Sequence, residues 1–108
     1  MMTWAEAAAA AGGRLAVGAP EAPLGTIVTD SRAAAGAVFV ALRGPKFDAH
    51  AFLDARLAAA SSGWIVRRGA KLPGSRPAHV LEVEDTQAAL GALAAAWRSR
   101  FSIPIVGV

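Results

Sequence analysis

Polar side chains gather in two short segments of this chain, each placed directly after residues with strand character. The first segment is Thr29-Asp30-Ser31-Arg32, which follows Ile27-Val28. A hydroxyl, a carboxylate and a guanidinium in succession offer donor and acceptor groups to a nucleoside, and Arg32 suits planar or phosphate recognition. The same residues also fit an Asx or Ser turn with a solvated Arg32. By themselves, the residues leave both interpretations open.

The second segment is Gly44-Pro45-Lys46-Phe47-Asp48-Ala49-His50. It combines a Gly-Pro connection, a cation and an aromatic ring with Asp48 and His50, which stand at the start of a predicted helix whose free backbone amides favour anions. This combination suits a nucleotide diphosphate. An alternative interpretation, with equal support, makes Asp48 a plain N-cap, Phe47 a hydrophobic staple and His50 a surface residue.

Metal and nucleophile chemistry have much less support. Asp48 with His50 is too sparse for a zinc site, and the acidic residues of 82–85 alternate along a strand end, where Asp85 is expected to cap a helix. The chain has no Cys, and no serine stands in a G-x-S-x-G context, so a catalytic triad is not supported either. We therefore expect no metal site and no catalytic residue here.

Composition is that of a single compact domain. The 108 residues include 11 Lys and Arg, 8 Asp and Glu and no Cys, with 55% hydrophobic positions. A chain of this length can bury a self-standing core without disulfides. No apolar run is long enough to cross a bilayer, and the first residues lack the basic start of a signal peptide. We expect a cytoplasmic monomer that makes no membrane contact.

The net charge of +3 and the sequence pI of 10.6 raise a different class of function, a small basic nucleic-acid-binding module. The basic residues are scattered, however, and only Arg67-Arg68 forms an adjacent pair. A basic stripe with interleaved aromatic residues, which single-stranded nucleic acid would need, is lacking. We expect no nucleic-acid partner, and this module stays an alternative on charge alone.

Helix and strand signals alternate along the chain. A first helix begins with the capping box Thr3 and Glu6 and ends at Gly12-Gly13. Further segments are strands at 27–29, 38–42, 64–66, 80–83 and 103–108, and helices at 48–60 and after Asp85. Residues 67–77 are the most loop-like, and His79 is expected in a loop as well. This alternation predicts an α/β fold, a small mixed or largely parallel sheet with flanking helices, which binds ligands at its carboxyl strand ends.

The order of these motifs resembles the N-terminal domain of the Mur ligases, over nearly the whole chain. The D-S-R of 30–32, the V-F-V-A-L-R-G of 38–44 and the F-D-A-H of 47–50 are similar to the family's DSR, PGDLFVAL-G and FDGHDF stretches. Residues 82–98 and 104–108 resemble the helix that follows and the strand that leads into the family's ATP site. One departure is Ala49, which stands where the family usually has Gly.

The resemblance implies a role in peptidoglycan precursor synthesis, with ATP and Mg²⁺ as cofactors of the full enzyme. Such a ligase transfers the γ-phosphoryl of ATP to a substrate carboxylate, and an amine attacks the acyl phosphate. The family's P-loop would follow Val108, so this fragment is expected to bind neither cofactor and to be inactive alone. The implied domains are 1–102, which binds the UDP substrate, and 103–108, the first strand of the ATP-binding domain.

Within the family, F-D-x-H and the W-R-S-R-F of 97–101 look more like the member that joins D-alanyl-D-alanine to UDP-N-acetylmuramoyl-tripeptide. The member that adds the third amino acid stays an alternative. Carried over from the family's motifs, the UDP contacts are Ser31, Pro45, Lys46 and Phe47, followed by Asp30, Arg32, Asp48 and His50.

Overall fold

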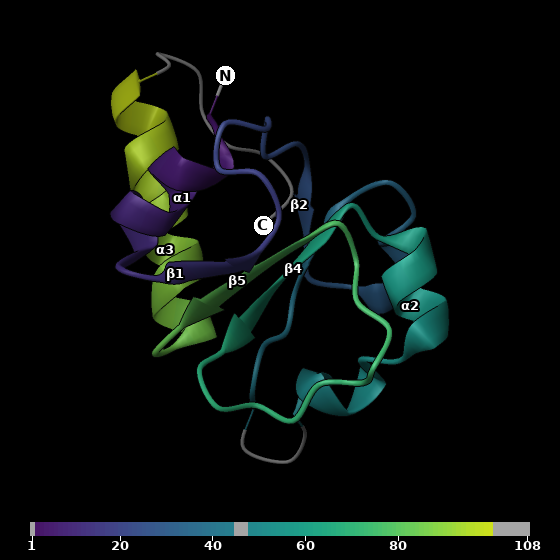
Figure 1. The fold of residues 1–108 in the computed structure, drawn as a ribbon. Helices are drawn as coiled ribbons and strands as arrows, with labels where there is room; N and C mark the ends of the chain where they lie inside the picture. Colours follow the sequence, from purple (N-terminus) through teal and green to yellow (C-terminus); the bar gives the residue numbers. More distant parts are fainter. Residues whose placement is uncertain (1, 45–47, 101–108) are drawn as a thin grey trace.

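A computed structural model describes residues 2–44 and 48–100 of the chain, with helices on both faces of a central sheet (Figure 1). The strands are β1 Arg14–Val17, β2 Ile27–Val28, β3 Val38–Val40, β4 Gly63–Arg67 and β5 His79–Val83. The helices are α1 Trp4–Ala11, α2 Ala55–Ala60 and α3 Thr86–Arg100, with the short 3-10 helices η1 Ser31–Ala33 and η2 Ala49–Phe52.

The strand order in the described part of the chain is β1-β5-β4-β3-β2. The pairs β2–β3, β3–β4 and β4–β5 are parallel, and β1 runs antiparallel to β5 at one edge. A mixed, largely parallel sheet with flanking helices was expected from the sequence, and the structure confirms it.

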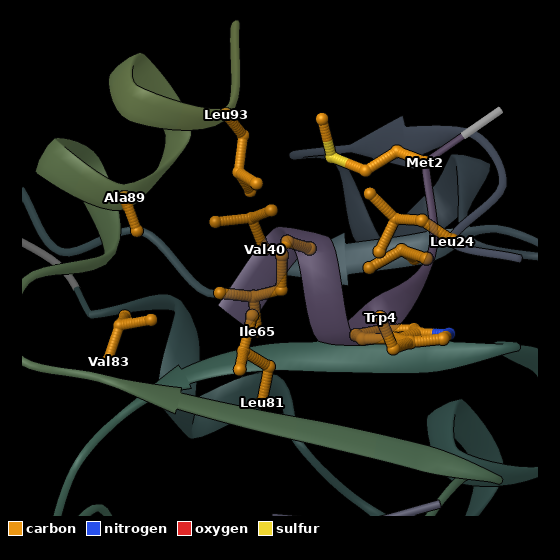
Figure 2. Close-up of a cluster of buried hydrophobic side chains, with 11 residues drawn as sticks. Met2, Trp4, Leu24, Val40, Ile65, Leu81, Val83, Ala89 and Leu93 are labelled. Atoms are coloured by element: carbon orange, nitrogen blue, oxygen red, sulfur yellow. The ribbon is translucent and has the colours of Figure 1, made fainter. Parts of the chain in front are cut away.

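Both faces of the sheet are buried, because successive side chains of a strand point to opposite faces. One face carries Val38, Val40, Ile65, Leu81 and Val83, which pack with Trp4 of α1 and with Ala89 and Leu93 of α3 (Figure 2). The other face carries Phe39, Trp64, Val66 and Val80, which pack with Leu53, Leu57 and Ala58. This two-sided burial explains why β3 and residues 64–66 of β4 are continuous apolar runs in the sequence.

Helices α1 and α3 lie side by side over one face, and α2 lies on the opposite side (Figure 1). The capping box of α1 is present: the Thr3 hydroxyl accepts from the Glu6 N–H at 3.2 Å, and the Glu6 carboxylate accepts from the Thr3 N–H at 2.9 Å. Asp85 begins α3, where its Oδ1 accepts from the N–H groups of Gln87 and Ala88. Both predicted helix starts are therefore confirmed.

The helix predicted over 48–60 is wrong in one respect, because the chain forms two pieces there. Leu53 has extended dihedrals between η2 and α2, with its side chain in the core. Asp54 then acts as a new N-cap, and its Oδ1 accepts from the Leu57 N–H at 2.8 Å. An aspartate side chain that accepts a hydrogen bond from a backbone N–H further along the chain favours a helix start over a helix interior. Asp54 therefore begins α2 and does not continue η2.

Two further parts of the sequence prediction are corrected by the structure. Strand β1 was not predicted, and it pairs with β5 in the register Arg14↔Glu82. His79 is not a loop residue: it begins β5, and its ring stacks on Trp4 with centroids 4.8 Å apart and planes 5° from parallel. This stack joins α1 to the sheet at a point where no periodic pattern in the sequence indicated a contact.

Candidate functional site

The carboxyl ends of four strands meet at one edge of the sheet, because β2, β3, β4 and β5 are mutually parallel. Residues 29–32 follow β2, and residues 41–50 follow β3. The two polar segments singled out in the sequence therefore leave neighbouring strands at the same edge. This is where open α/β sheets bind ligands. Three of the predicted contacts, Pro45, Lys46 and Phe47, lie outside the described residues.

Asp30 organises the first segment. Its Oδ1 accepts from the Arg32 N–H at 2.9 Å and so caps η1, in the Asx turn that was one of the two expected arrangements. Its Oδ2 lies 3.0 Å from the guanidinium Nη2 of Arg32, and this pair lowers the pKa of Asp30. The Arg32 side chain is 89% exposed, so the ion pair is worth little energy.

Ser31 remains available in this arrangement. It is half-buried, and its hydroxyl has no hydrogen-bond partner among the described residues. The turn is closed by Asp30 and Arg32, so the Ser31 hydroxyl keeps both its donor and its acceptor capacity for a ligand. The Asx turn and a nucleoside contact are thus compatible at this segment.

His50 is the best-fixed side chain of the second segment. Its Nδ1 lies 2.5 Å from Oδ1 of Asp48, and its Nε2 accepts from the backbone N–H of Arg67 at 2.9 Å. Because Nε2 is an acceptor, the proton sits on Nδ1 and the ring is neutral. The contact with Asp48 is therefore a hydrogen bond rather than an ion pair.

The alternative that made His50 a surface residue is wrong, since its side chain is only 9% exposed. The ring ties the segment after β3 to the end of β4 and leaves no free nitrogen for a ligand. His50 is thus a positioning residue in this structure. Asp48 is an N-cap, as that alternative expected, and its Oδ1 also accepts from the His50 N–H at 3.0 Å. This bond and the contact with the ring lower the pKa of Asp48.

Residues 42–43 and 48–49 are held together by backbone hydrogen bonds. Arg43 and Asp48 form a single antiparallel bridge, and the Ala49 N–H donates to the Leu42 carbonyl at 2.9 Å. Ala49, the departure from the family's Gly, is buried, and no non-Gly residue in the described ranges has a positive φ. Alanine is therefore accommodated at this position without left-handed backbone strain.

A solvent-open pocket of about 290 Å³ lies at the same edge of the sheet. It is lined by Arg43, His50, Arg67, Glu84, Asp85, Thr86 and Gln87. Of these, only His50 was predicted as a site residue. Arg67 and Thr86 were missed, although the rule that points to the ends of β2 and β3 applies equally to residues that end or follow β4 and β5.

No three His, Asp or Glu side chains within 2–44 and 48–100 come together in a way that would hold a metal ion. None of the helices in these ranges is long and apolar enough to cross a membrane.

No family model matches the chain, but comparison of its sequence and structure with known proteins identifies relatives. UDP-N-acetylmuramoyl-tripeptide–D-alanyl-D-alanine ligase of Synechocystis sp. is 42% identical over 86 residues, which are 79% of this chain and 19% of the relative. Two crystal structures of MurF from Acinetobacter baumannii superpose with TM-scores of 0.72 and 0.73 at 34% identity, and the match covers 91% of this chain. The chain has the fold of the MurF N-terminal domain.

The resemblance to the Mur ligases noted in the sequence is thereby confirmed at the level of sequence and of fold. The chain spans about a fifth of the length of these MurF relatives: 19% of the Synechocystis ligase and 21% of each Acinetobacter structure.

Proposed function

We propose that this chain is the UDP-binding N-terminal domain of a MurF-type ligase of peptidoglycan precursor synthesis. The observation that carries the proposal is the placement of two polar segments, 29–32 and 48–50, after neighbouring parallel strands of a MurF-like fold. The relatives named above join D-alanyl-D-alanine to their substrate, which favours this member of the family over the one that adds the third amino acid.

In this proposal the nucleoside lies against the segment after β2. The free Ser31 hydroxyl offers a donor and an acceptor, which suits the alternating N–H and C=O groups of uracil. The exposed Arg32 and Asp30 hold each other and shape the turn that presents Ser31.

The segment after β3 supplies the second half of the cradle. Asp48 and His50 are fixed by their hydrogen bonds, and Asp48 is bridged to Arg43. We propose that Pro45, Lys46 and Phe47, which stand between these residues in the sequence, contact the nucleotide. Lys46 supplies a cation for phosphate and Phe47 an aromatic face for the base. Their contacts remain part of the proposal, because they lie outside the described residues.

The ligase reaction belongs to the whole enzyme. There, ATP supplies the γ-phosphoryl group that activates the carboxylate of UDP-N-acetylmuramoyl-tripeptide, and the amine of D-alanyl-D-alanine attacks the acyl phosphate. In this proposal ATP and Mg²⁺ belong to the rest of the ligase, and this chain contributes substrate binding. Domain limits of 1–102 and 103–108, a monomeric state and a cytoplasmic location form part of the same proposal.

An NMR titration of the chain with UDP tests this assignment. Amide signals of 29–32 and 44–50 are expected to shift, and Ser31→Ala is expected to weaken binding about five- to ten-fold, as the loss of one hydrogen bond would. Ser75→Ala, in the loop between β4 and β5, serves as the matched control and should bind like the parent. A titration that shifts neither segment contradicts the proposal. Retention on heparin that falls steeply with salt, together with no response to UDP, would instead favour the nucleic-acid module.

A further inference from the structure

The ring of His50 joins two parts of the chain that come from different strands. Its Nδ1 lies 2.5 Å from Oδ1 of Asp48, in the segment after β3. Its Nε2 accepts from the backbone N–H of Arg67, the last residue of β4, at 2.9 Å. The His50 side chain is only 9% exposed, so both contacts are made in a largely buried place. The position of residues 48–50 relative to β4 therefore depends in part on one acceptor nitrogen.

The link between His50 and Arg67 exists only while the ring is neutral. A ring nitrogen of histidine accepts a hydrogen bond only when it carries no proton, and an imidazolium has a donor N–H at both nitrogens. If Nε2 gained a proton, its N–H would point at the N–H of Arg67 across the 2.9 Å that the hydrogen bond now spans. Histidine is also the side chain that changes its charge between about pH 8 and pH 5. A modest change in pH can therefore break this link.

The charged side chains that contact the ring or line the pocket with it end or follow β3, β4 and β5: they are Asp48, Arg43, Arg67, Glu84 and Asp85. Asp48 stabilises a protonated ring, whereas the guanidinium groups of Arg43 and Arg67 oppose one. The other two carboxylates are already engaged, because Glu84 pairs with Arg68 at 3.0 Å and Asp85 caps α3. These charges set the pH at which the ring gains a proton, and the bond from Arg67 sets the structural result.

We infer that His50 is a pH-sensitive positioning residue, and that only its neutral form holds the segment after β3 in the arrangement that binds substrate. The inference rests on the proposed function and adds a control of the same site. When Nε2 takes a proton from solvent, the contact with Asp48 becomes an ion pair and the bond from Arg67 is lost. The segment after β3 then separates from the end of β4, and substrate affinity falls as the pH is lowered.

NMR of the 108-residue chain tests the structural step without any ligand. Between pH 7.5 and 5.5, the ring of His50 should change from the neutral form with its proton on Nδ1 to the imidazolium. Over the same range, the protection of the Arg67 amide against hydrogen exchange, corrected for the intrinsic rate, should fall about ten-fold. A ring that stays neutral to pH 5.5, or an Arg67 amide that stays protected after the ring is protonated, overturns the inference.

Calorimetric titration with UDP-N-acetylmuramoyl-tripeptide at the same two pH values tests the effect on binding. Both phosphates of this substrate are esterified, whereas the terminal phosphate of UDP itself gains a proton near about pH 6. The parent should bind the substrate about ten-fold more weakly at pH 5.5 than at pH 7.5. His50→Gln should bind it equally at both, because the amide oxygen can accept from Arg67 and does not titrate.

His79→Gln is the matched control, because His79 is the other histidine of the chain and begins β5, at the opposite end of the sheet. This variant should keep the pH dependence of the parent. A loss of affinity at pH 5.5 that is as large in His50→Gln as in the parent overturns the inference. If His50→Gln does not fold, judged from its amide spectrum, the ring of His50 and the amide of Arg67 in the parent decide the matter.

The outcomes separate this inference from the proposed function. Substrate binding that shifts the amides of 29–32 but has the same affinity at both pH values overturns the inference and leaves the proposed function intact. No substrate binding at either pH contradicts the proposed function. The ligand-free measurements on His50 and Arg67 then still decide whether the ring positions the segment after β3.

Discussion

Position 63 is constrained by the stack of Trp4 on His79. A Cβ at Gly63 would lie 2.5 and 2.6 Å from two carbons of the Trp4 ring and 3.1 Å from the His79 carbonyl oxygen. Trp4 is 1% exposed, so its ring has no free space into which to move. Strand β4 therefore begins with glycine because α1 packs directly on its backbone.

Gly63→Ala is expected to lower the free energy of unfolding by about 1–3 kcal/mol, the usual effect of overpacking a core, as measured by urea denaturation. Gly91→Ala is the control, since Gly91 is exposed in α3 and nothing lies within 4 Å of its missing Cβ. Gly91→Ala should raise the free energy of unfolding by about 1 kcal/mol, because alanine has a higher helix propensity than glycine. Equal stability of Gly63→Ala and the parent would show that Trp4 does not cover this position.

The Asp48 carboxylate predicts a pH-dependent contribution to stability. Its pKa is lowered by the hydrogen bonds from His50, so the folded state favours the ionised form. The contribution is full above the unfolded pKa of about 3.9 and is lost as the pH falls through the lower folded pKa. The Asp48 side chain is 37% exposed, so solvent screening keeps the charge contribution below about 1 kcal/mol.

Asp48→Asn keeps the acceptor but cannot ionise. The parent should be the more stable of the two at pH 6, and the difference in unfolding free energy should shrink as the pH is lowered from 6 to 2, in paired urea denaturations. Other carboxylates titrate in both proteins and cancel. A difference that is constant between these pH values would show that the Asp48 charge makes no contribution.

Some contacts of single residues in the site could not be predicted from the sequence. The sequence placed Asp48 and His50 together because they are two residues apart. It gave no sign that the ring would accept from the backbone of Arg67, 17 positions later. The buried, unpartnered Nε of Arg67 was missed for the same reason, because its surroundings are known only once the neighbouring strands are in place.

At the scale of elements, the break between η2 and α2 gives a prediction that separates the structure from the sequence-based expectation. Asp54→Ala removes the N-cap of α2 and should lower the unfolding free energy by about 1 kcal/mol, whereas Asp54→Asn should be nearly neutral. If the helix ran unbroken through 48–60, Asp54 would be an interior position and alanine would stabilise the protein. Thermal or urea denaturation of the two variants distinguishes these outcomes.

The elements that were predicted well are those with a local sequence pattern, either a run of apolar residues or a helix cap. Strand β3 and residues 64–66 of β4 are continuous apolar runs because both faces of the sheet are covered, and β5 contains three buried apolar residues, Val80, Leu81 and Val83. The starts of α1 and α3 have local caps. Strand β1 has neither, since its four residues are mostly half-buried and its formation depends on pairing with β5, far along the chain.

At the scale of the whole molecule, the polar side chains of the candidate site lie at one edge of the sheet. Ser31 follows β2, Asp48 and His50 follow β3, and the pocket lined by Arg67 and Thr86 lies at the ends of β4 and β5. The opposite ends of these strands contribute packing such as the Trp4–His79 stack. Ligand specificity is therefore expected to depend on this edge, and stability on the two buried faces.

The identity of the base provides the most direct test of the account. UDP and ADP carry the same diphosphate, so a calorimetric titration of the chain with each isolates what the segment after β2 recognises. The account predicts one UDP bound per chain and much weaker binding of ADP under the same conditions. No heat with UDP, or equal affinity for both nucleotides, would contradict the claim that this edge of the sheet is a uridine nucleotide site.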